Sequence, residues 1–133
     1  MKYKLTKKRG NDIISSRRES GCIMAYESKF KREDIDELFE AILTLKDQED
    51  CYRFFEDICT INEIHAIAQR LQVARLLSEK KTYMEIEAAT KASTATISRI
   101  NKCLVYGADG YRRIIERLRE SEADGEEHGK ADK

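Results

Sequence analysis

The residues with the clearest capacity for chemistry lie in the segment STATISRINKCL, residues 93–104. Serine and threonine hydroxyls can hydrogen-bond several base edges, and the methyl groups of threonine and alanine can contact a thymine methyl. Arginine and lysine side chains contact phosphates. If the segment is a helix that enters the major groove, the residues expected to meet DNA are Thr94, Ala95, Ser98, Arg99 and Lys102. The same pattern is also typical of an ordinary helical hairpin with hydroxyl residues at one helix start.

Catalytic and metal-binding patterns are not found elsewhere in the sequence. It has two histidines and four cysteines, but no Ser/His/Asp, Cys/His, P-loop or GxGxxG arrangement. His65 has no second residue at metal-ligand spacing, so we interpret it as an ordinary helix histidine. Cys51 and Cys59 are interpreted as packing residues and all four cysteines as free thiols of a cytoplasmic protein, while thiol sensing at Cys103 stays open. We predict no enzyme, no metal and no cofactor.

Composition and charge limit the fold and the partners. A chain of 133 residues predicts one domain, and the absence of proline favours helices joined by short turns. Its apolar runs are too short for a membrane span or a secretory signal. The net charge is zero, but residues 33–66 hold eleven acidic against two basic residues, and residues 67–106 hold seven basic against three acidic. An anionic partner is therefore expected to dock on the second of these segments.

Apolar spacing of three and four residues predicts about six helices. The first begins near Arg32, and the last covers about residues 109–119. Polar residues at cap positions mark the four helices between them, with capping-box spacing at the second and third of these starts. These predicted N-caps are Asp47, Thr60, Thr82 and Ser93. Gly107 is predicted to end the fifth helix in a left-handed conformation.

The fourth and fifth helices form the pattern of a helix-turn-helix over residues 82–105. A helix of about two turns, a break of about three residues and a helix of about three turns is typical of this motif. Small residues suit the point where the two helices meet, at Ala88, Ala89 and Ala92. Ile97, Ile100 and Leu104 recur on one face and are expected to hold the second helix to its scaffold.

The segment TYMEIEAATKASTATISRINKCL, residues 82–104, resembles the helix-turn-helix of the Trp repressor superfamily. The match is closest over ATISR, residues 95–99, with one conservative change at Ser98. The acidic first helix and the stretch YGADGYRRIIERL resemble the YerC/YecD branch of that superfamily. The resemblance covers about residues 28–118 and implies an all-α, Trp repressor-like fold in which the helices of two chains interlock as a homodimer. Long apolar faces on the first three helices fit such a dimer.

The resemblance also indicates which functions are altered. The Trp repressor holds its tryptophan between two arginines, of which the second matches Arg99 and the first falls on Gln69. The glycine that makes room for the indole falls on Ile100, and a serine near the ligand falls on Cys103. A branched side chain at Ile100 would fill the space of the ligand. We therefore predict a degenerate tryptophan pocket and an unknown effector that is not tryptophan.

The resemblance also assigns DNA contacts. Thr94 and Ala95 match base-reading positions of the repressor, and Thr82 matches a phosphate-contacting position. The basic residues that the repressor uses from its first motif helix fall on Met84 and Glu87. A glutamate repels phosphate, so DNA affinity is expected either to be low or to depend on other basic groups.

Three regions are predicted along the chain. Residues 28–120 form the helical domain, and residues 121–133 form a disordered polar tail. Residues 1–27 read as a disordered basic arm or as a mis-annotated start, because Arg-Arg-Glu before Met24 is what an in-frame ribosome-binding site encodes.

Two functions of different classes follow from the sequence. The first is a sequence-specific transcriptional regulator, a homodimer that reads a pseudo-palindromic site in double-stranded DNA with residues 93–104. The second is a helical protein–protein interaction module on a repressor-like scaffold with weak or no DNA binding.

Overall fold

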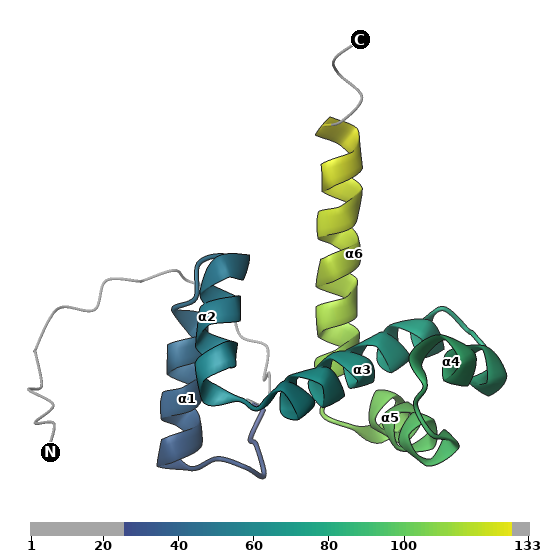
Figure 1. Ribbon diagram of the computed structural model, residues 1–133, viewed down its shortest axis with the longest axis horizontal. Coiled ribbons are helices and arrows are strands. Elements are labelled where there is room, and N and C mark those ends of the chain that lie inside the picture. The colour runs from purple at the N-terminus through teal and green to yellow at the C-terminus, as the bar shows by residue number, and fades with distance from the viewer. Residues whose placement is uncertain (1–25, 129–133) are drawn as a thin grey trace, which may run out of the picture. The chain divides into compact units, whose positions relative to one another are not determined.

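The computed structural model describes residues 26–128, with side chains to residue 125, so the predicted start at Met24 lies outside the described residues. Six helices and no strand occur in this range, which confirms the predicted all-α class (Figure 1). The helices are α1 (Glu33–Leu43), α2 (Gln48–Ile58), α3 (Ile61–Ser78), α4 (Tyr83–Thr90), α5 (Thr94–Tyr106) and α6 (Gly110–His128).

The four predicted N-caps are confirmed, and they explain where α2 to α5 begin. Asp47 accepts a hydrogen bond from the backbone N–H of Asp50 at 2.9 Å, and Ser93 accepts one from the backbone N–H of Thr96 at 3.2 Å. Thr60 and Thr82 each form a complete capping box with the glutamate three residues later. Each box satisfies two backbone donors that a helix start leaves without partners.

A small hydrophobic core joins the C-terminal half of α3 to α4, α5 and α6. The side chains of Val73, Ile86 and Ile97 are completely inaccessible to solvent. α3 contacts each of the other three helices (Figure 1). The whole cluster of buried hydrophobic residues consists of Val73, Ala74, Ile86, Ala92, Ile97, Ile100 and Ile115.

The chain divides into two compact units between Thr44 and Leu45, and each is described by itself. The first unit contains α1, whose first turn is acidic and whose Phe39 and Leu43 are exposed. The second unit contains α2 to α6. Within α2, the rings of Phe54 and Phe55 meet edge to face with centroids 5.5 Å apart.

The predicted left-handed cap at Gly107 was wrong. Gly107 has φ −83° and ψ −162°, which is extended backbone, and its N–H donates to the carbonyl of Cys103 at 2.9 Å. A Cβ at this position would collide with that carbonyl oxygen. The residue is therefore suited to glycine because of a close approach, and the left-handed residue in this connection is Asp109, with φ 66°.

The sixth helix is longer than predicted. It continues to His128, whereas the sequence predicted an unstructured polar tail after residue 120. Arg75 of α3 forms an ion pair with Glu122 at 3.0 Å, and Arg119 donates to the hydroxyl of Ser78 at 2.9 Å. These bonds attach the polar part of α6 to the end of α3. Within the described range, none of the helices combines the length and the apolar character needed to cross a membrane.

Candidate nucleic-acid interface

The connection between α4 and α5 is a tight turn held by hydrogen bonds. Thr90 donates its hydroxyl to the carbonyl of Ile86 at 2.7 Å and accepts from the backbone N–H of Ala92 at 3.2 Å. Lys91 takes the left-handed conformation, with φ 59°, and Ala92 is buried. Ser93 then caps α5. α4, this turn and α5 thus form the predicted helix-turn-helix.

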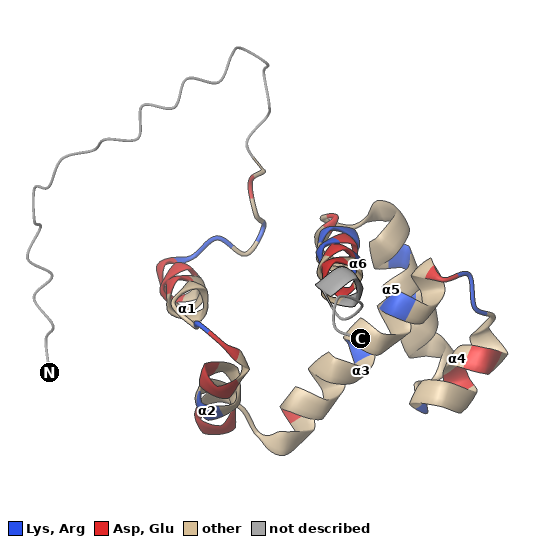
Figure 2. Cartoon of the chain, turned by 90° about the horizontal axis from the view of Figure 1, so that it is seen from above, with Lys and Arg blue, Asp and Glu red and all other residues tan. Residues whose placement is uncertain are grey.

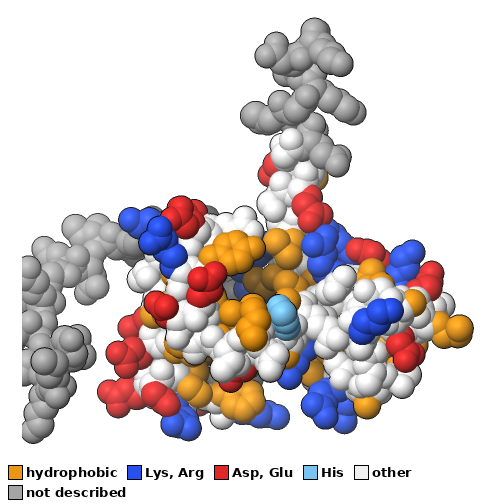
Figure 3. Space-filling view, viewed as in Figure 1, with side chains coloured by type: hydrophobic (Ala, Val, Ile, Leu, Met, Phe, Trp, Pro, Cys, Tyr) orange, Lys and Arg blue, Asp and Glu red, His pale blue; other side chains and the backbone are white. Residues whose placement is uncertain are grey.

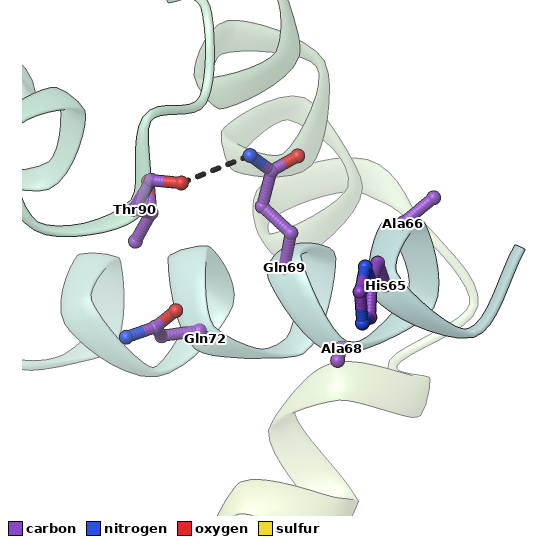
Figure 4. Close-up of a pocket in the computed structure, with 6 residues that line it drawn as sticks. All are labelled: His65, Ala66, Ala68, Gln69, Gln72 and Thr90. Carbon is purple, nitrogen blue, oxygen red and sulfur yellow. Dashed lines mark hydrogen bonds between the residues drawn. The ribbon is translucent and has the colours of Figure 1, made fainter. Parts of the chain in front are cut away.

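A second contact fastens the turn to α3. The side-chain amide of Gln69 donates to the backbone carbonyl of Thr90 at 2.9 Å (Figure 4). Gln69 is half-buried, and it borders an open depression of about 390 Å³. The lining residues of this depression are His65, Ala66, Ala68, Gln69, Gln72 and Thr90.

One face of α5 is exposed, and its opposite face is anchored in the core. Ile97 is fully buried and Ile100 is 3% exposed. The exposed side chains begin at the first turn and form two adjacent rows, each with a repeat of four residues, so they share one side of the helix. The structure thus brings together five of the predicted DNA-contacting residues, which we call the reading face: Thr94, Ala95, Ser98, Arg99 and Lys102.

The sixth predicted contact, Thr82, lies at the start of α4 and is exposed. Its hydroxyl is engaged in the capping box, since it lies 2.9 Å from the Glu85 carboxylate and 3.3 Å from the Glu85 backbone nitrogen. The hydrogen bond from the backbone N–H of Thr82 lowers the pKa of Glu85, with a smaller contribution from the hydroxyl. Glu85 is therefore ionised at neutral pH, beside the place where a phosphate would approach Thr82.

The exposed side of α4 is poor in positive charge. Met84 is 82% exposed and Glu87 is exposed one turn further on. Figure 2 shows acidic positions within α4 and basic positions in the segment that precedes it. α4 itself contains no lysine or arginine, so the positive charges next to it in the chain lie in the segments before and after the helix.

Two such cations were missed by the sequence reasoning. Lys80 and Lys91 lie before and after α4, are exposed, and have φ values of 64° and 59°. Neither forms an ion pair or a side-chain hydrogen bond within the part of the chain that the structure describes. Their positions in the sequence could have identified them, because each lies two residues before an N-cap. Lys80 precedes Thr82, and Lys91 precedes Ser93.

Of the four residues of the predicted degenerate tryptophan pocket, one, Gln69, lines the depression described above, whereas the other three are not among the lining residues of that depression. Ile100 belongs to the core, and Arg99 and Cys103 are exposed on α5. One of the two N–H donors of the Gln69 amide is already used by the Thr90 carbonyl.

Comparisons with known proteins agree with this geometry. The family model described as Trp repressor protein matches residues 33–119. The uncharacterized protein YerC of Bacillus subtilis (strain 168) is 55% identical over 96 residues, which is 72% of this chain and 92% of YerC.

Two crystal structures resemble the chain in both sequence and fold. A proposed Trp repressor from Staphylococcus aureus has a TM-score of 0.66 and 49% identity, over 68% of this chain and 91% of that one. A TrpR-like protein from Eubacterium eligens ATCC 27750 has a TM-score of 0.66 and 56% identity, over 68% and 93% respectively. The family model covers every residue of the core, and the chain carries a reading face on a helix-turn-helix. The chain belongs to the Trp repressor family, in the branch that contains YerC.

Proposed function

We propose that this protein is a sequence-specific DNA-binding transcriptional regulator that reads the major groove with α5. The Trp repressor family is a family of regulators and not of enzymes. The observation that carries the proposal is the reading face, because short polar side chains and two cations are exposed on a helix whose opposite side is fixed in the core. A recognition helix needs one face that is packed rigidly against its scaffold and an opposite face that is accessible to DNA.

The roles of the reading face divide along the helix. Thr94, Ala95 and Ser98 lie toward the start of α5, where side chains of a recognition helix meet base edges. Arg99 and Lys102 lie further along, where contact with the phosphate backbone is expected. Thr82 is the proposed phosphate contact from α4. Its backbone N–H and its hydroxyl both donate to the Glu85 carboxylate in the free chain, so a phosphate would have to displace that carboxylate from at least one of them.

A homodimer would give the protein two reading faces. The second unit leaves large apolar side chains exposed on α2 and α3, including Tyr52, Ile58, Ile61 and Ile67. Figure 3 shows hydrophobic side chains grouped over α2 and the start of α3. We infer that a second copy of the chain covers them. Two copies of α5 would then enter successive major grooves about 34 Å apart, on a pseudo-palindromic site.

Selection of bound sequences from a random pool of duplex DNA tests the proposal. The full chain should enrich a pseudo-palindrome, and Thr94→Glu should abolish that binding because a carboxylate would face bases and phosphates. Thr94 is exposed in the first turn of α5, where a negative charge is favourable to the helix, so the variant should remain folded. Ser121→Glu makes the same kind of change on α6 and should bind like the wild type. Wild-type affinity of folded Thr94→Glu would contradict the proposal.

The exposed Met84 and Glu87 favour a second candidate, a protein–protein interaction module that binds through α4. Met84→Lys separates the two functions. If α4 lies against DNA, the added cation should strengthen binding and steepen its salt dependence by about one unit in the log–log slope. If α4 meets a protein instead, any DNA affinity and its salt dependence should stay unchanged.

A further inference from the structure

The hydrogen bond between the Gln69 side chain and the Thr90 carbonyl differs from the other side-chain bonds of α3 in the element that it reaches. In the described part of the chain it is the one side-chain hydrogen bond that joins α3 to the helix-turn-helix. The other long-range side-chain bonds of α3, Arg75 with Glu122 and Ser78 with Arg119, go to α6. All other contacts between α3 and the motif are packing contacts, and packing alone fixes direction less strictly than a hydrogen bond does.

Thr90 lies at the point where the direction of α5 is set. It is 9% exposed, and it is the last residue of α4. Carbonyls at a helix end have no partner within the helix, and a buried carbonyl without a partner is costly. Gln69 supplies that partner. The hydroxyl of the same Thr90 accepts from Ala92, one residue before the N-cap of α5. Thr90 is therefore hydrogen-bonded to α3 on one side and to the residue before the N-cap of α5 on the other.

We propose that Gln69 is a positioning residue that holds the α4–α5 turn and thereby sets the orientation of the reading face. The hydrogen-bond donor for this turn thus comes from α3 of the same chain. The effect on DNA affinity rests on the proposed function, whereas the effect on the turn rests on the Gln69–Thr90 contact alone.

The matched pair Gln69→Glu and Gln72→Glu tests this proposal. Glutamate has the shape of glutamine but only accepts hydrogen bonds when ionised, so at position 69 it would face the Thr90 carbonyl with a repelling oxygen. Gln72 lies on the same helix, lines the same depression and is exposed, and its side chain forms no hydrogen bond in the described structure. Both variants add one negative charge to α3, but only Gln69→Glu loses the hydrogen bond to the Thr90 carbonyl.

Two measurements are made on the full chain. The first is hydrogen exchange of the Ala92 amide, whose partner is the Thr90 hydroxyl. The second is affinity for the DNA sequence selected by the wild type. Loss of one partly buried hydrogen bond should speed exchange and weaken DNA binding by about tenfold each in Gln69→Glu. Gln72→Glu should stay within about twofold of the wild type in both, as expected for a surface change.

A conservative rescue distinguishes the hydrogen bond from side-chain volume. Gln69→Lys keeps a donor at the end of an unbranched chain and should retain wild-type exchange of Ala92. Gln69→Leu has no donor and should behave like Gln69→Glu. Cooperative thermal unfolding of each variant confirms that the core is intact.

The possible results separate the proposal from the proposed function. Equal exchange of Ala92 in the wild type, Gln69→Glu and Gln72→Glu would overturn the proposal. Faster exchange in Gln69→Glu with unchanged DNA affinity would overturn the positioning role. If the wild type selects no DNA, the proposed function fails, and the exchange comparison still decides whether Gln69 holds the turn.

Discussion

Lys91 occupies a backbone conformation that side chains of its type rarely adopt, with φ 59°. A left-handed residue with a Cβ costs about 1–2 kcal/mol relative to glycine. Asp109 is also left-handed, but aspartate tolerates this region better, and its carboxylate pairs with Arg112 at 3.3 Å. No comparable partner of Lys91 occurs among the described residues. If the Lys91 ammonium group contacts a phosphate of bound DNA, that contact would offset the free-energy cost of the left-handed backbone.

Lys91→Gly should therefore affect stability and DNA binding in opposite directions. Loss of the left-handed strain stabilises the fold, and the greater freedom of unfolded glycine offsets part of this gain, so the Tm should not fall. Loss of one cation should weaken binding and reduce the log–log salt slope by about one. Thermal unfolding and binding at several salt concentrations measure the two effects. An unchanged salt slope would show that Lys91 does not contact phosphate.

At the residue scale, side chains with local partners were predictable, and backbone strain was not. Thr60, Thr82 and Ser93 were identified as N-caps because their partners lie three residues away in sequence. The sequence did not indicate the left-handed backbone of Lys91, because lysine has no preference for a left-handed turn. Gln69 was identified only as a changed ligand position, since its partner Thr90 lies 21 residues further along the chain.

The two capping boxes make the starts of α3 and α4 sensitive to acid. Hydrogen bonds from Thr60 and Thr82, chiefly from their backbone N–H groups, lower the pKa values of Glu63 and Glu85 below the ordinary value of 4.5. The ionised carboxylates are thus favoured in the folded chain. Their contribution to the free energy of unfolding is present above pH 4.5 and is lost as the pH falls through the folded pKa values.

Glu85→Gln should reduce this acid sensitivity. Glutamine can still accept the hydrogen bond of a capping box but does not titrate, so stability below pH 4.5 should fall less steeply than in the wild type. Urea unfolding between neutral and acid pH measures the difference. Glu87→Gln removes a carboxylate from the same helix without touching the box, and it should keep the wild-type slope. Equal slopes for all three proteins would contradict the assignment.

At the element scale, the helix starts were predicted more reliably than the helix ends. N-cap side chains signal a start locally, whereas the end of α6 depends on contacts with a distant helix. The polar sequence after residue 120 lacks an apolar face, which led to the wrong prediction of a disordered tail. Its attachment through Glu122 to Arg75 could not be read from spacing, because the partners lie 47 residues apart.

At the scale of the whole molecule, one chain buries few of its large apolar side chains. Among the residues that the structure describes, all seven buried hydrophobic ones belong to α3, α4, α5, α6 and the α4–α5 turn, and α1 and α2 have none. A domain of this size with an exposed apolar face gains stability when a second copy covers it. The second copy is therefore expected to contribute to both the fold and the spacing of the two reading faces.

Ile67→Glu tests the dimer. Ile67 is 52% exposed in the single chain, so a charge there costs the isolated fold little but would be buried without a partner in a dimer. The wild type should have twice the chain mass by sedimentation equilibrium, and Ile67→Glu should shift toward the monomer. Ser121→Glu, on the exposed part of α6, should remain dimeric. A wild type with the mass of a single chain at all concentrations would contradict the inferred assembly.

The family, the helix count and the position of the motif could be predicted from the sequence because each depends on local pattern. The side of the molecule on which we propose a second chain could not, since apolar positions on α2 and α3 have the same periodicity whether they face their own core or a partner. The structure separates these two sets by burial, with Val73 and Ala74 inaccessible and Ile61 and Ile67 open to solvent.

The contact of α3 with α4, α5 and α6 has a consequence for the order of folding. α3 packs against all three of the other helices in this core, so we expect its C-terminal half to be largely formed in the folding transition state. Its N-terminal half contains no fully buried side chain and is expected to form later. Substitutions at Ala74 should therefore act mainly on the rate of folding, whereas substitutions at Ile61 should act mainly on the rate of unfolding.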